Sequence, residues 1–220
     1  MGQVAILGGT FDPVHWGHLL IAETALDQLS LDQVIWVPAT RPPHKHGLAY
    51  EHRRLMVEMA IADNPAFVLS PMEFTQTSPD YAIKTLTHLQ DNYPKSQWYW
   101  VIGLDAFQTL PRWYCREKLI PACDWLVAPR SVSVTSTGAV CVERASQYQE
   151  VDPQHLWRCQ HIVGQLAAQN ISIRWQLLQM PLVSISSCLI RQYCRQRRSI
   201  RYLVPEAVQA YITTHKLYLD

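Results

Sequence analysis

The fold of this 220-residue chain is decided by one segment near its start, Val4-Ala5-Ile6-Leu7-Gly8-Gly9-Thr10-Phe11-Asp12-Pro13-Val14-His15-Trp16-Gly17-His18. Its first four residues are all apolar, which is typical of a short strand buried on both faces of a parallel sheet. The glycines at 8 and 9 predict a sharp turn, and Leu19, Ala22 and Leu26 then recur at the spacing of a helix. A strand, a tight turn and a helix in this order predict the first unit of an α/β sheet.

The same alternation of strand and helix continues along the chain. Further strands are predicted at 34–37, 67–70, 98–102, 124–128 and 171–178, and further helices at 51–62, 79–93, 153–168, 187–195 and 205–215. Strands joined through helices pair in parallel by right-handed crossovers. We therefore expect an α/β fold, a Rossmann-like doubly wound parallel sheet with a small C-terminal helical part. Residues 1–220 are expected to form a single domain, with 131–150 as a variable or mobile insertion.

Composition argues against several classes of protein. Hydrophobic residues make up 48% of the chain, enough for a sizeable core. The net charge of +1 gives no global electrostatic reason to expect a nucleic acid or a membrane surface as partner. No apolar stretch approaches the ~20 residues that span a bilayer, and the start lacks the features of a signal peptide. The six cysteines form no C-x-x-C pair, so we expect a cytoplasmic protein with reduced thiols.

The segment 8–18 has the features of a phosphate-binding turn. Ligands of open parallel sheets bind beyond the carboxyl ends of the strands, where glycines let the backbone approach a bulky ligand. The helix that follows offers free N–H groups and a partial positive charge. His15 and His18, three residues apart, share a helix face and can donate hydrogen bonds to phosphate oxygens. Gly17 between them is expected to leave room for a nucleotide.

Two other interpretations of these histidines stay open. They could be plain helix-capping residues, or they could form a zinc site with His44 and His46. The zinc site is the weaker alternative because no carboxylate or thiolate is placed to complete it. We therefore expect no metal bound by protein side chains. The segment is neither a Walker A loop nor a G-x-G-x-x-G turn.

A second helix start, at 186–191, predicts a second phosphate site. Ser186 and Ser187 follow a short apolar stretch and precede a helix, the usual place of a serine cap. Arg191 falls one turn inside, where its guanidinium can lean back over the helix start. Amides, a serine hydroxyl and a guanidinium together would form an anion cradle.

With both motifs in hand, the chain resembles the bacterial nicotinate-nucleotide adenylyltransferases of the H-x-G-H nucleotidyltransferase superfamily. The resemblance covers nearly the whole chain and lies in G-G-T-F-D-P-V-H-W-G-H at 8–18, P-P-H-K at 42–45, G-L-D at 103–105, W-Y at 113–114, I-S-S-C-L-I-R at 185–191, Y-L-V-P at 202–205 and L-Y at 217–218. It implies an enzyme of NAD biosynthesis that transfers an adenylyl group from ATP to nicotinate mononucleotide, giving deamido-NAD and pyrophosphate. It also implies Mg²⁺ bound through the ATP phosphates, and it allows a homo-oligomer.

The resemblance also assigns roles to residues. His15, His18 and Arg191 would be catalytic, holding the ATP phosphates. ATP would further be bound by Gly8, Gly9, Thr10, Phe11, Gly103, Asp105, Ser186 and Ser187, and the mononucleotide by Lys45, Tyr81, Ala82, Trp113 and Tyr114. Trp113 would stack on the pyridine ring, and backbone amides would meet its carboxylate. The chain departs from the family at Cys188, where Ser or Thr is usual, and at Ala82, where Thr is frequent.

The expected chemistry needs no general base, because the attacking phosphate oxygen is already ionised near neutral pH. Catalysis then consists of holding two polyanions together and neutralising charge as pyrophosphate leaves. Other acceptors remain open: nicotinamide mononucleotide, phosphopantetheine, or a CTP-dependent reaction. So does a non-catalytic nucleotide-binding or RNA-binding module, although retention of both histidines, Lys45 and Arg191 argues against it. Trp98, Trp100 and Trp125 are expected in the core.

Overall fold

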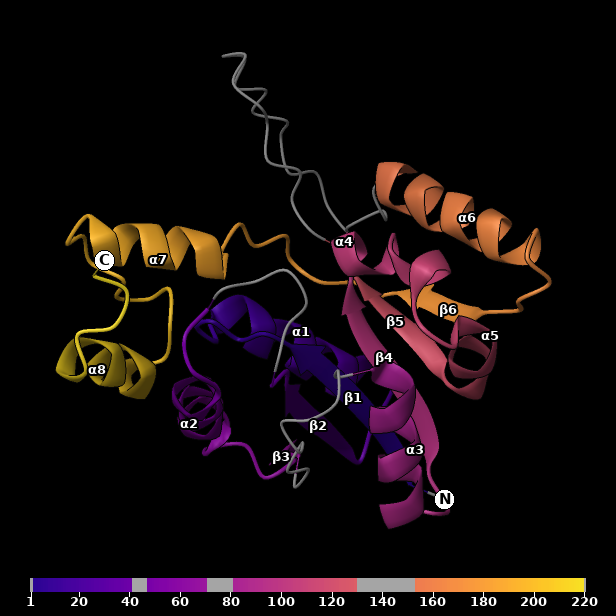
Figure 1. The fold of residues 1–220 in the computed structure, drawn as a ribbon, viewed down its shortest axis with the longest axis horizontal. Helices are drawn as coiled ribbons and strands as arrows, with labels where there is room; N and C mark the ends of the chain where they lie inside the picture. Colours follow the sequence, from indigo (N-terminus) through magenta and orange to yellow (C-terminus); the bar gives the residue numbers. More distant parts are fainter. Residues whose placement is uncertain (1, 41–46, 71–80, 130–152, 220) are drawn as a thin grey trace.

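The computed structural model describes residues 2–40, 47–70, 81–129 and 153–219, and these form a single parallel sheet covered by helices (Figure 1). The strands are β1 (Gln3–Gly9), β2 (Gln33–Pro38), β3 (Phe67–Leu69), β4 (Gln97–Gly103), β5 (Asp124–Ala128) and β6 (Arg174–Leu177). Their order in the sheet is β3-β2-β1-β4-β5-β6, and every pair is parallel. The predicted Rossmann-like fold is confirmed. The predicted insertion at 131–150 lies outside the described residues.

Helices cover both faces of this sheet. They are α1 (Trp16–Gln28), α2 (Tyr50–Ile61), α3 (Ala82–Asn92), α4 (Leu104–Phe107), α5 (Arg116–Leu119), α6 (Pro153–Ala167), α7 (Ser187–Arg195) and α8 (Glu206–Thr214), with short 3₁₀ turns η1 (Leu110–Arg112) and η2 (Ile120–Ala122). Apolar side chains of α1, α2, α7 and α8 join one core cluster, and those of α3 to α6 join another. The C-terminal helices α7 and α8 form the predicted small helical part beside α1 and α2 (Figure 1).

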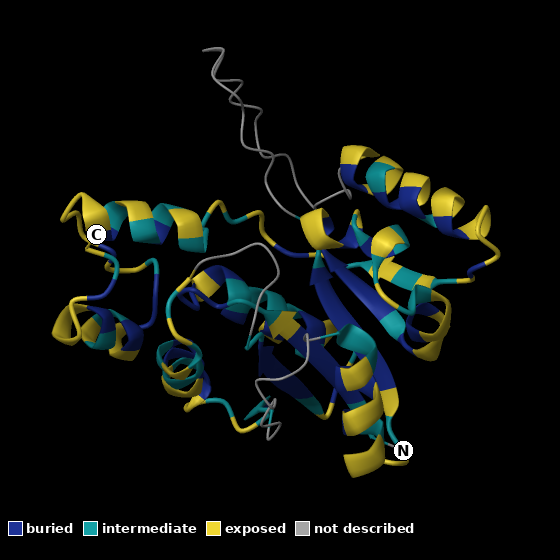
Figure 2. Ribbon diagram, viewed as in Figure 1, coloured by how far each residue is buried: buried dark blue, intermediate teal, exposed yellow. Residues whose placement is uncertain are grey.

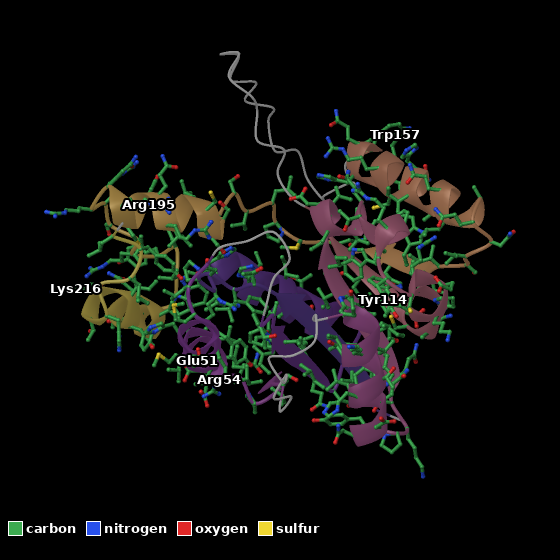
Figure 3. All side chains as sticks on the ribbon, viewed as in Figure 1. Glu51, Arg54, Tyr114, Trp157, Arg195 and Lys216 are labelled. Carbon is green, nitrogen blue, oxygen red and sulfur yellow. The ribbon has the colours of Figure 1, made fainter. Side chains whose placement is uncertain are left out.

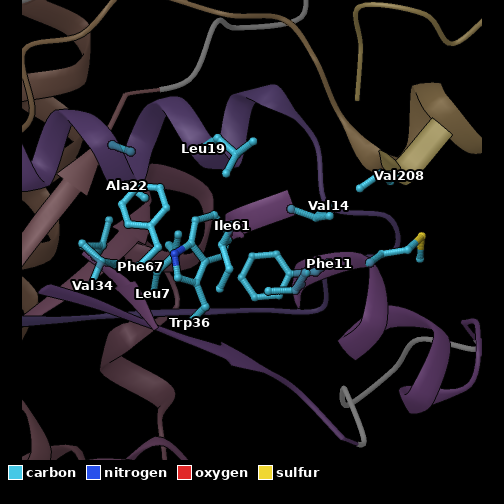
Figure 4. Close-up of a cluster of buried hydrophobic side chains, with 14 of the residues drawn as sticks. Leu7, Phe11, Val14, Leu19, Ala22, Val34, Trp36, Ile61, Phe67 and Val208 are labelled. Atoms are coloured by element: carbon cyan, nitrogen blue, oxygen red, sulfur yellow. The ribbon is translucent and has the colours of Figure 1, made fainter. Parts of the chain in front are cut away.

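Strand β1 supplies both cores because its side chains alternate between the two faces. Ala5 and Leu7 pack toward α1 and α2, and Val4 and Ile6 pack toward α3 and α6. The strands are buried along most of their length, as Figure 2 shows. Figure 4 shows the first core, where Phe11 lies among Trp36 and other apolar side chains. Burial on both faces explains the continuous apolar run at the start of the chain.

Two predicted boundaries differ from the structure. The helix predicted at 79–93 begins only at Ala82, because Tyr81 is extended, with φ −84° and ψ 130°, and serves as its N-cap. Pro79, the predicted first residue of that helix, lies outside the described residues. The strand predicted at 171–178 is limited to Arg174–Leu177, where it pairs with β5. Both errors arise at element ends, where local pattern is weakest.

The cysteines in the described ranges are free thiols: Cys115, Cys123, Cys159, Cys188 and Cys194. Burial raises the pKa of Cys123 to about 12 and that of Cys159 to about 11. Both therefore stay protonated near neutral pH and act as small apolar core residues. Across the same ranges, no helix has the length and apolarity needed to cross a membrane.

A fully buried arginine, which sequence analysis does not single out, ties two loops to α2. Arg53 is 2% exposed, and its guanidinium donates to the carbonyls of Leu48 (2.9 Å), Thr10 (2.7 Å) and Thr40 (3.3 Å). Thr10 belongs to the loop after β1, and Thr40 to the loop after β2. One guanidinium with several fixed donors can satisfy all three carbonyls at once. Arg53 thus holds the carboxyl-end loops of two neighbouring strands together.

Replacing this arginine should cost far more stability than replacing its neighbour. In Arg53→Met the buried carbonyls lose their donors, so the free energy of unfolding should fall by about 2–5 kcal/mol. Arg54→Met is the matched control, since Arg54 points outward on α2 (Figure 3) and pairs with the exposed Glu58 at 3.2 Å. Such an exposed ion pair contributes about 0.3–0.5 kcal/mol to the free energy of unfolding. Urea unfolding of both variants measures the difference, and equal losses would contradict this role for Arg53.

Candidate active site

A cavity lies at the carboxyl edge of the sheet, where the strand order changes direction between β1 and β4. Its volume is about 390 Å³. The ends of four neighbouring strands line it: Gly8 and Gly9 from β1, Val37 from β2, Gly103 from β4 and Ala128 from β5. Crevices of this kind are the usual ligand sites of doubly wound sheets, because the chain leaves the sheet in opposite directions on the two sides.

Side chains and main chain from three further regions complete the cavity. The lining residues are His15, Gly17, His18 and Ile21 around the start of α1; Ala82, Thr85, Trp100, Ala106 and Trp113 on the β4 side; and Met180, Val183 and Ile185 before α7. Of the residues predicted at the site, Gly8, Gly9, His15, His18, Ala82, Gly103 and Trp113 therefore meet around one space. The contribution of the segment at 180–185 was not predicted, because nothing in its local pattern marks a cavity wall.

His15 and His18 lie face to face at the start of α1. Their ring centroids are 3.7 Å apart with an interplanar angle of 24°, and the two residues form a reciprocal capping box. The His18 ring accepts the backbone N–H of His15 through Nδ1 at 3.3 Å. A neutral imidazole that accepts at Nδ1 carries its proton on Nε2. The capping role and the phosphate-binding role are thus compatible, since they use different nitrogens of the ring.

The glycines of this segment line the cavity and also make room for side chains of the protein itself. A Cβ on Gly9 would lie 2.9 Å from the Phe11 ring, and one on Gly17 would lie 3.0 Å from the His15 ring. These two glycines thus make room for neighbouring side chains of the protein itself. A Cβ on Gly8 would meet nothing closer than Trp100 at 3.8 Å, so the space beside Gly8 is not filled by a neighbouring side chain. Gly17 also lines the cavity, so its predicted use, space for a nucleotide, stays a prediction.

The two helix starts predicted from the sequence lie side by side. The Ser187 hydroxyl donates to the carbonyl of Pro13 at 2.8 Å, and a Cβ on Gly17 would lie 3.7 Å from the carbonyl of Ile185. The start of α1 is less open than predicted, because the N–H of Trp16 donates to the carbonyl of Leu203 at 3.2 Å. The imidazoles therefore offer more to an anion here than the first amide of the helix.

The two serines of the second motif are already engaged in different ways. Ser186 is the N-cap of α7, and its Oγ accepts the N–H of Leu189 at 3.2 Å. A hydroxyl has a single proton to donate, so the hydroxyl proton of Ser186 is not consumed by this cap. The proton of Ser187 is used by Pro13. The geometry thus favours the Ser186 hydroxyl, together with the amides of the first turn, as the anion donors of α7.

Arg191 is anchored to the loop that follows β1. Its Nη1 donates to the carbonyl of Asp12 at 2.6 Å and lies 3.8 Å from the Asp12 carboxylate oxygen Oδ2. The other carboxylate oxygen, Oδ1, accepts the hydroxyl of Tyr218 at 2.8 Å. Burial, followed by the charge of Asp12, raises the pKa of Tyr218 far above its ordinary value, so its hydroxyl stays protonated. Sequence analysis missed this link, which no local pattern encodes.

Tryptophans form a rigid wall on the β4 side of the cavity. Trp113 donates from Nε1 to the Thr109 hydroxyl at 2.8 Å, and its ring meets Trp100 and Trp125 edge-on, with centroids 6.3 and 6.0 Å away. Trp100 and Trp125 stack on each other at 5.7 Å. The prediction that Trp98, Trp100 and Trp125 are buried is confirmed, although Trp100 also lines the cavity. Trp113 is thus oriented before any ligand binds.

Several residues predicted at the site stand outside the cavity lining. Phe11 is 2% exposed and packs edge-on against His18 at 5.0 Å, so it supports the histidine from the core. Thr10 accepts from Arg53 through its carbonyl. Tyr81 and Tyr114 stack at 4.3 Å beside the lining residues Ala82 and Trp113, and Asp105 lies between Gly103 and Ala106. Lys45 lies outside the described residues.

The described residues contain no group of three His, Cys, Asp or Glu side chains that could hold a metal ion. The zinc alternative also required His44 and His46, which lie outside these ranges. Mg²⁺ differs from zinc in this respect, since it keeps several waters and binds mainly through substrate phosphates. An arrangement of imidazole, hydroxyl, amide and guanidinium donors suits a polyanion that brings its own cation.

Solved structures share this fold along the whole chain. A nicotinic acid mononucleotide adenylyltransferase of Plasmodium falciparum, solved in complex with NaAD, aligns with a TM-score of 0.73 at 17% identity and covers 99% of this chain and 98% of its own. The same enzyme in complex with APC aligns with a TM-score of 0.71 at 16% identity, with the same coverage. At this identity the likeness supports the fold alone.

Relatives of known name match far more closely in sequence. A protein of Trichormus variabilis named "Probable nicotinate-nucleotide adenylyltransferase" is 50% identical over 220 residues, which covers 100% of this chain and 99% of the relative. A protein of the same name from Synechococcus sp. (strain JA-3-3Ab) is 42% identical over 221 residues, covering 99% of this chain and 95% of its own. The model of the cytidylyltransferase-like family matches residues 6–193. The chain therefore belongs to the cytidylyltransferase-like family and, within it, to the nicotinate-nucleotide adenylyltransferases.

Proposed function

We propose that this enzyme transfers the adenylyl group of ATP to nicotinate mononucleotide, forming deamido-NAD and releasing pyrophosphate. The observation that carries the proposal is the meeting of two helix starts, those of α1 and α7, at the carboxyl edge of the sheet. Each start bears donors suited to phosphate, and the cavity next to them extends from Gly8 to Trp113. A space with phosphate donors at one end and an oriented aromatic ring at the other suits two nucleotide substrates bound next to each other.

The reaction is an attack of the mononucleotide phosphate on the α-phosphorus of ATP. One oxygen–phosphorus bond forms, the bond to the β-phosphate breaks, and pyrophosphate leaves. Because the attacking oxygen is already ionised, the enzyme contributes positioning and stabilisation of charge. Mg²⁺ carried by the ATP phosphates would neutralise part of the charge on the leaving pyrophosphate.

The protein residues take distinct roles in this reaction. Nε2–H of His18, with His15 stacked behind it, donates to oxygens of the triphosphate. Ser186 and the first amides of α7 hold the phosphates from the opposite side, and Arg191 neutralises the charge that grows on the leaving group. Lys45 is proposed to reach a phosphate from the loop at 41–46. Trp113 stacks on the pyridine ring, beside the backbone of Tyr81 and Ala82 at the start of α3.

The choice of the nicotinate acceptor follows from the start of α3, next to Trp113. Backbone N–H groups at a helix start favour a negatively charged carboxylate over a neutral amide. Because a backbone donor has no need of a side-chain hydroxyl, Ala82 can stand where Thr is frequent. A cytoplasmic location, with no nucleic acid or membrane partner, fits an enzyme whose two substrates are small nucleotides, and assembly into a homo-oligomer stays a prediction.

Removing the His18 donor should reduce turnover strongly. His18→Ala should lower kcat by about 10²–10³-fold, the loss typical of one preorganised transition-state donor. His18→Gln, whose amide places an N–H near the position of Nε2, should lose less. His161→Ala is the control, because His161 is exposed on α6. Release of pyrophosphate measures all three variants, and near-normal turnover in His18→Ala would remove His18 from the mechanism.

Removing the Trp113 ring should weaken the binding of the mononucleotide but not that of ATP. Trp113→Leu should raise the KM for nicotinate mononucleotide by about 5- to 100-fold, the range expected from stacking one base on an aromatic ring. The KM for ATP should change by less than about threefold, since ATP phosphates bind at the other end of the cavity. Trp157→Leu is the control, because Trp157 is 65% exposed on α6, at the surface of the molecule (Figure 3). Equal effects on both substrates would contradict the assignment.

The choice between acid and amide can be tested directly. With nicotinate and nicotinamide mononucleotides in parallel assays, kcat/KM should be higher for the acid, because the amides of the α3 start meet a full negative charge. Higher salt should shrink the difference, since screening weakens the interaction with charge. A clear preference for nicotinamide mononucleotide would overturn the choice of acceptor and leave adenylyl transfer itself intact.

A further inference from the structure

The end of the chain returns to the loop that carries the first motif. Leu217 is buried in the core shared by α1, α2, α7 and α8, and this places Tyr218 beside the loop after β1. The Tyr218 hydroxyl donates to Asp12 Oδ1 at 2.8 Å, across 206 positions of sequence. No local pattern predicts this contact, because its two partners lie far apart in the sequence.

Asp12 is enclosed on several sides. It is 6% exposed, and a Cβ on Gly47 would lie only 2.7 Å from its Oδ2. The same oxygen lies 3.8 Å from Arg191 Nη1, which is longer than a hydrogen bond. Nη1 instead donates to the Asp12 main-chain carbonyl at 2.6 Å. The carboxylate and the guanidinium are therefore neighbours without forming the paired, two-bond geometry that Arg and Asp usually prefer.

The Tyr218 hydroxyl and Gly47 contact the two oxygens of the Asp12 carboxylate and so restrict its orientation. A bidentate pair with Arg needs the carboxylate turned so that both of its oxygens face the guanidinium. Tyr218 occupies Oδ1, and Gly47 packs against Oδ2. Within the described residues, Arg191 is held by its bond to the Asp12 carbonyl, and its side chain stays 28% exposed.

We propose that Tyr218 is a positioning residue that acts through Asp12 to keep Arg191 available to the ATP phosphates. The inference rests on the proposed role of Arg191 in ATP binding. Without the hydroxyl, the Asp12 carboxylate is free to turn toward the guanidinium and pair with it. That pair would neutralise the positive charge meant for the triphosphate and hold it against the loop.

Tyr218→Phe tests this directly, because it keeps the ring that packs on the core and removes only the hydroxyl. The dissociation constant of ATP for the whole chain, measured by calorimetry, and the KM for ATP should both rise by about tenfold. The KM for nicotinate mononucleotide should change by less than about twofold, and the melting temperature should stay within a few degrees. Tyr202→Phe is the matched control, since Tyr202 is 82% exposed, and it should change none of these values.

A second substitution separates positioning from a purely structural role. Asp12→Asn keeps an oxygen acceptor but removes the charge that would capture Arg191, so adding it to Tyr218→Phe should recover ATP affinity relative to Tyr218→Phe alone. Unchanged ATP affinity in Tyr218→Phe, a parallel loss for both substrates, or a further loss in the double variant would each overturn the proposal.

The proposed function can fail separately. If wild-type enzyme binds ATP but does not form deamido-NAD, the acceptor assignment is wrong, and the ATP affinities of the variants still decide the role of Tyr218. If wild-type enzyme does not bind ATP, both proposals are overturned.

Discussion

The site depends on one contact, the docking of the start of α7 onto the loop after β1. Ser187 donates to the carbonyl of Pro13 at 2.8 Å and Arg191 to that of Asp12 at 2.6 Å, across 174 and 179 positions of sequence. Both acceptors are main-chain carbonyls. Leaving such a carbonyl buried without a donor destabilises the folded state by about 1–3 kcal/mol. The position of α7 is therefore fixed by the backbone of the loop that also presents the histidines.

The parallel sheet makes this docking useful. Because β1 and β4 lie next to each other at the point where the strand order reverses, their carboxyl ends open a crevice. Gly8 and Gly103 leave that crevice lined by main chain, while Trp113 closes it on one side and the α7 approach closes it on the other. Arg53 holds the loops after β1 and β2 in place, since its guanidinium donates to a main-chain carbonyl of each loop. Rigid elements thus set the shape of the space before a ligand enters.

Local sequence pattern predicts an element correctly where a few adjacent residues are enough to define it. The strand at 124–128 and the helix at 187–195 match β5 and α7, because a buried apolar run and a serine cap are both read from adjacent residues. Local pattern is a weaker guide to which atoms occupy the space beside a glycine. Gly9 and Gly17 are expected to leave space for a ligand; both line the cavity, and both also make room for Phe11 and His15. A glycine shows that space is needed, but only packing shows which atoms fill it.

The sequence by itself determined the order of the elements, the sheet, and the two helix starts with their histidines, serines and arginine, because hydrophobic period and capping residues act over a few positions. Only the tertiary structure decided that Ser187 donates to the Pro13 carbonyl and that Arg53 donates to the carbonyls of two loops. It alone also decided that Tyr218 and Arg191 both contact Asp12. The physical reason is that a buried donor must find an acceptor wherever the folded chain brings one. That choice of partner spans much of the chain and leaves no trace in local spacing.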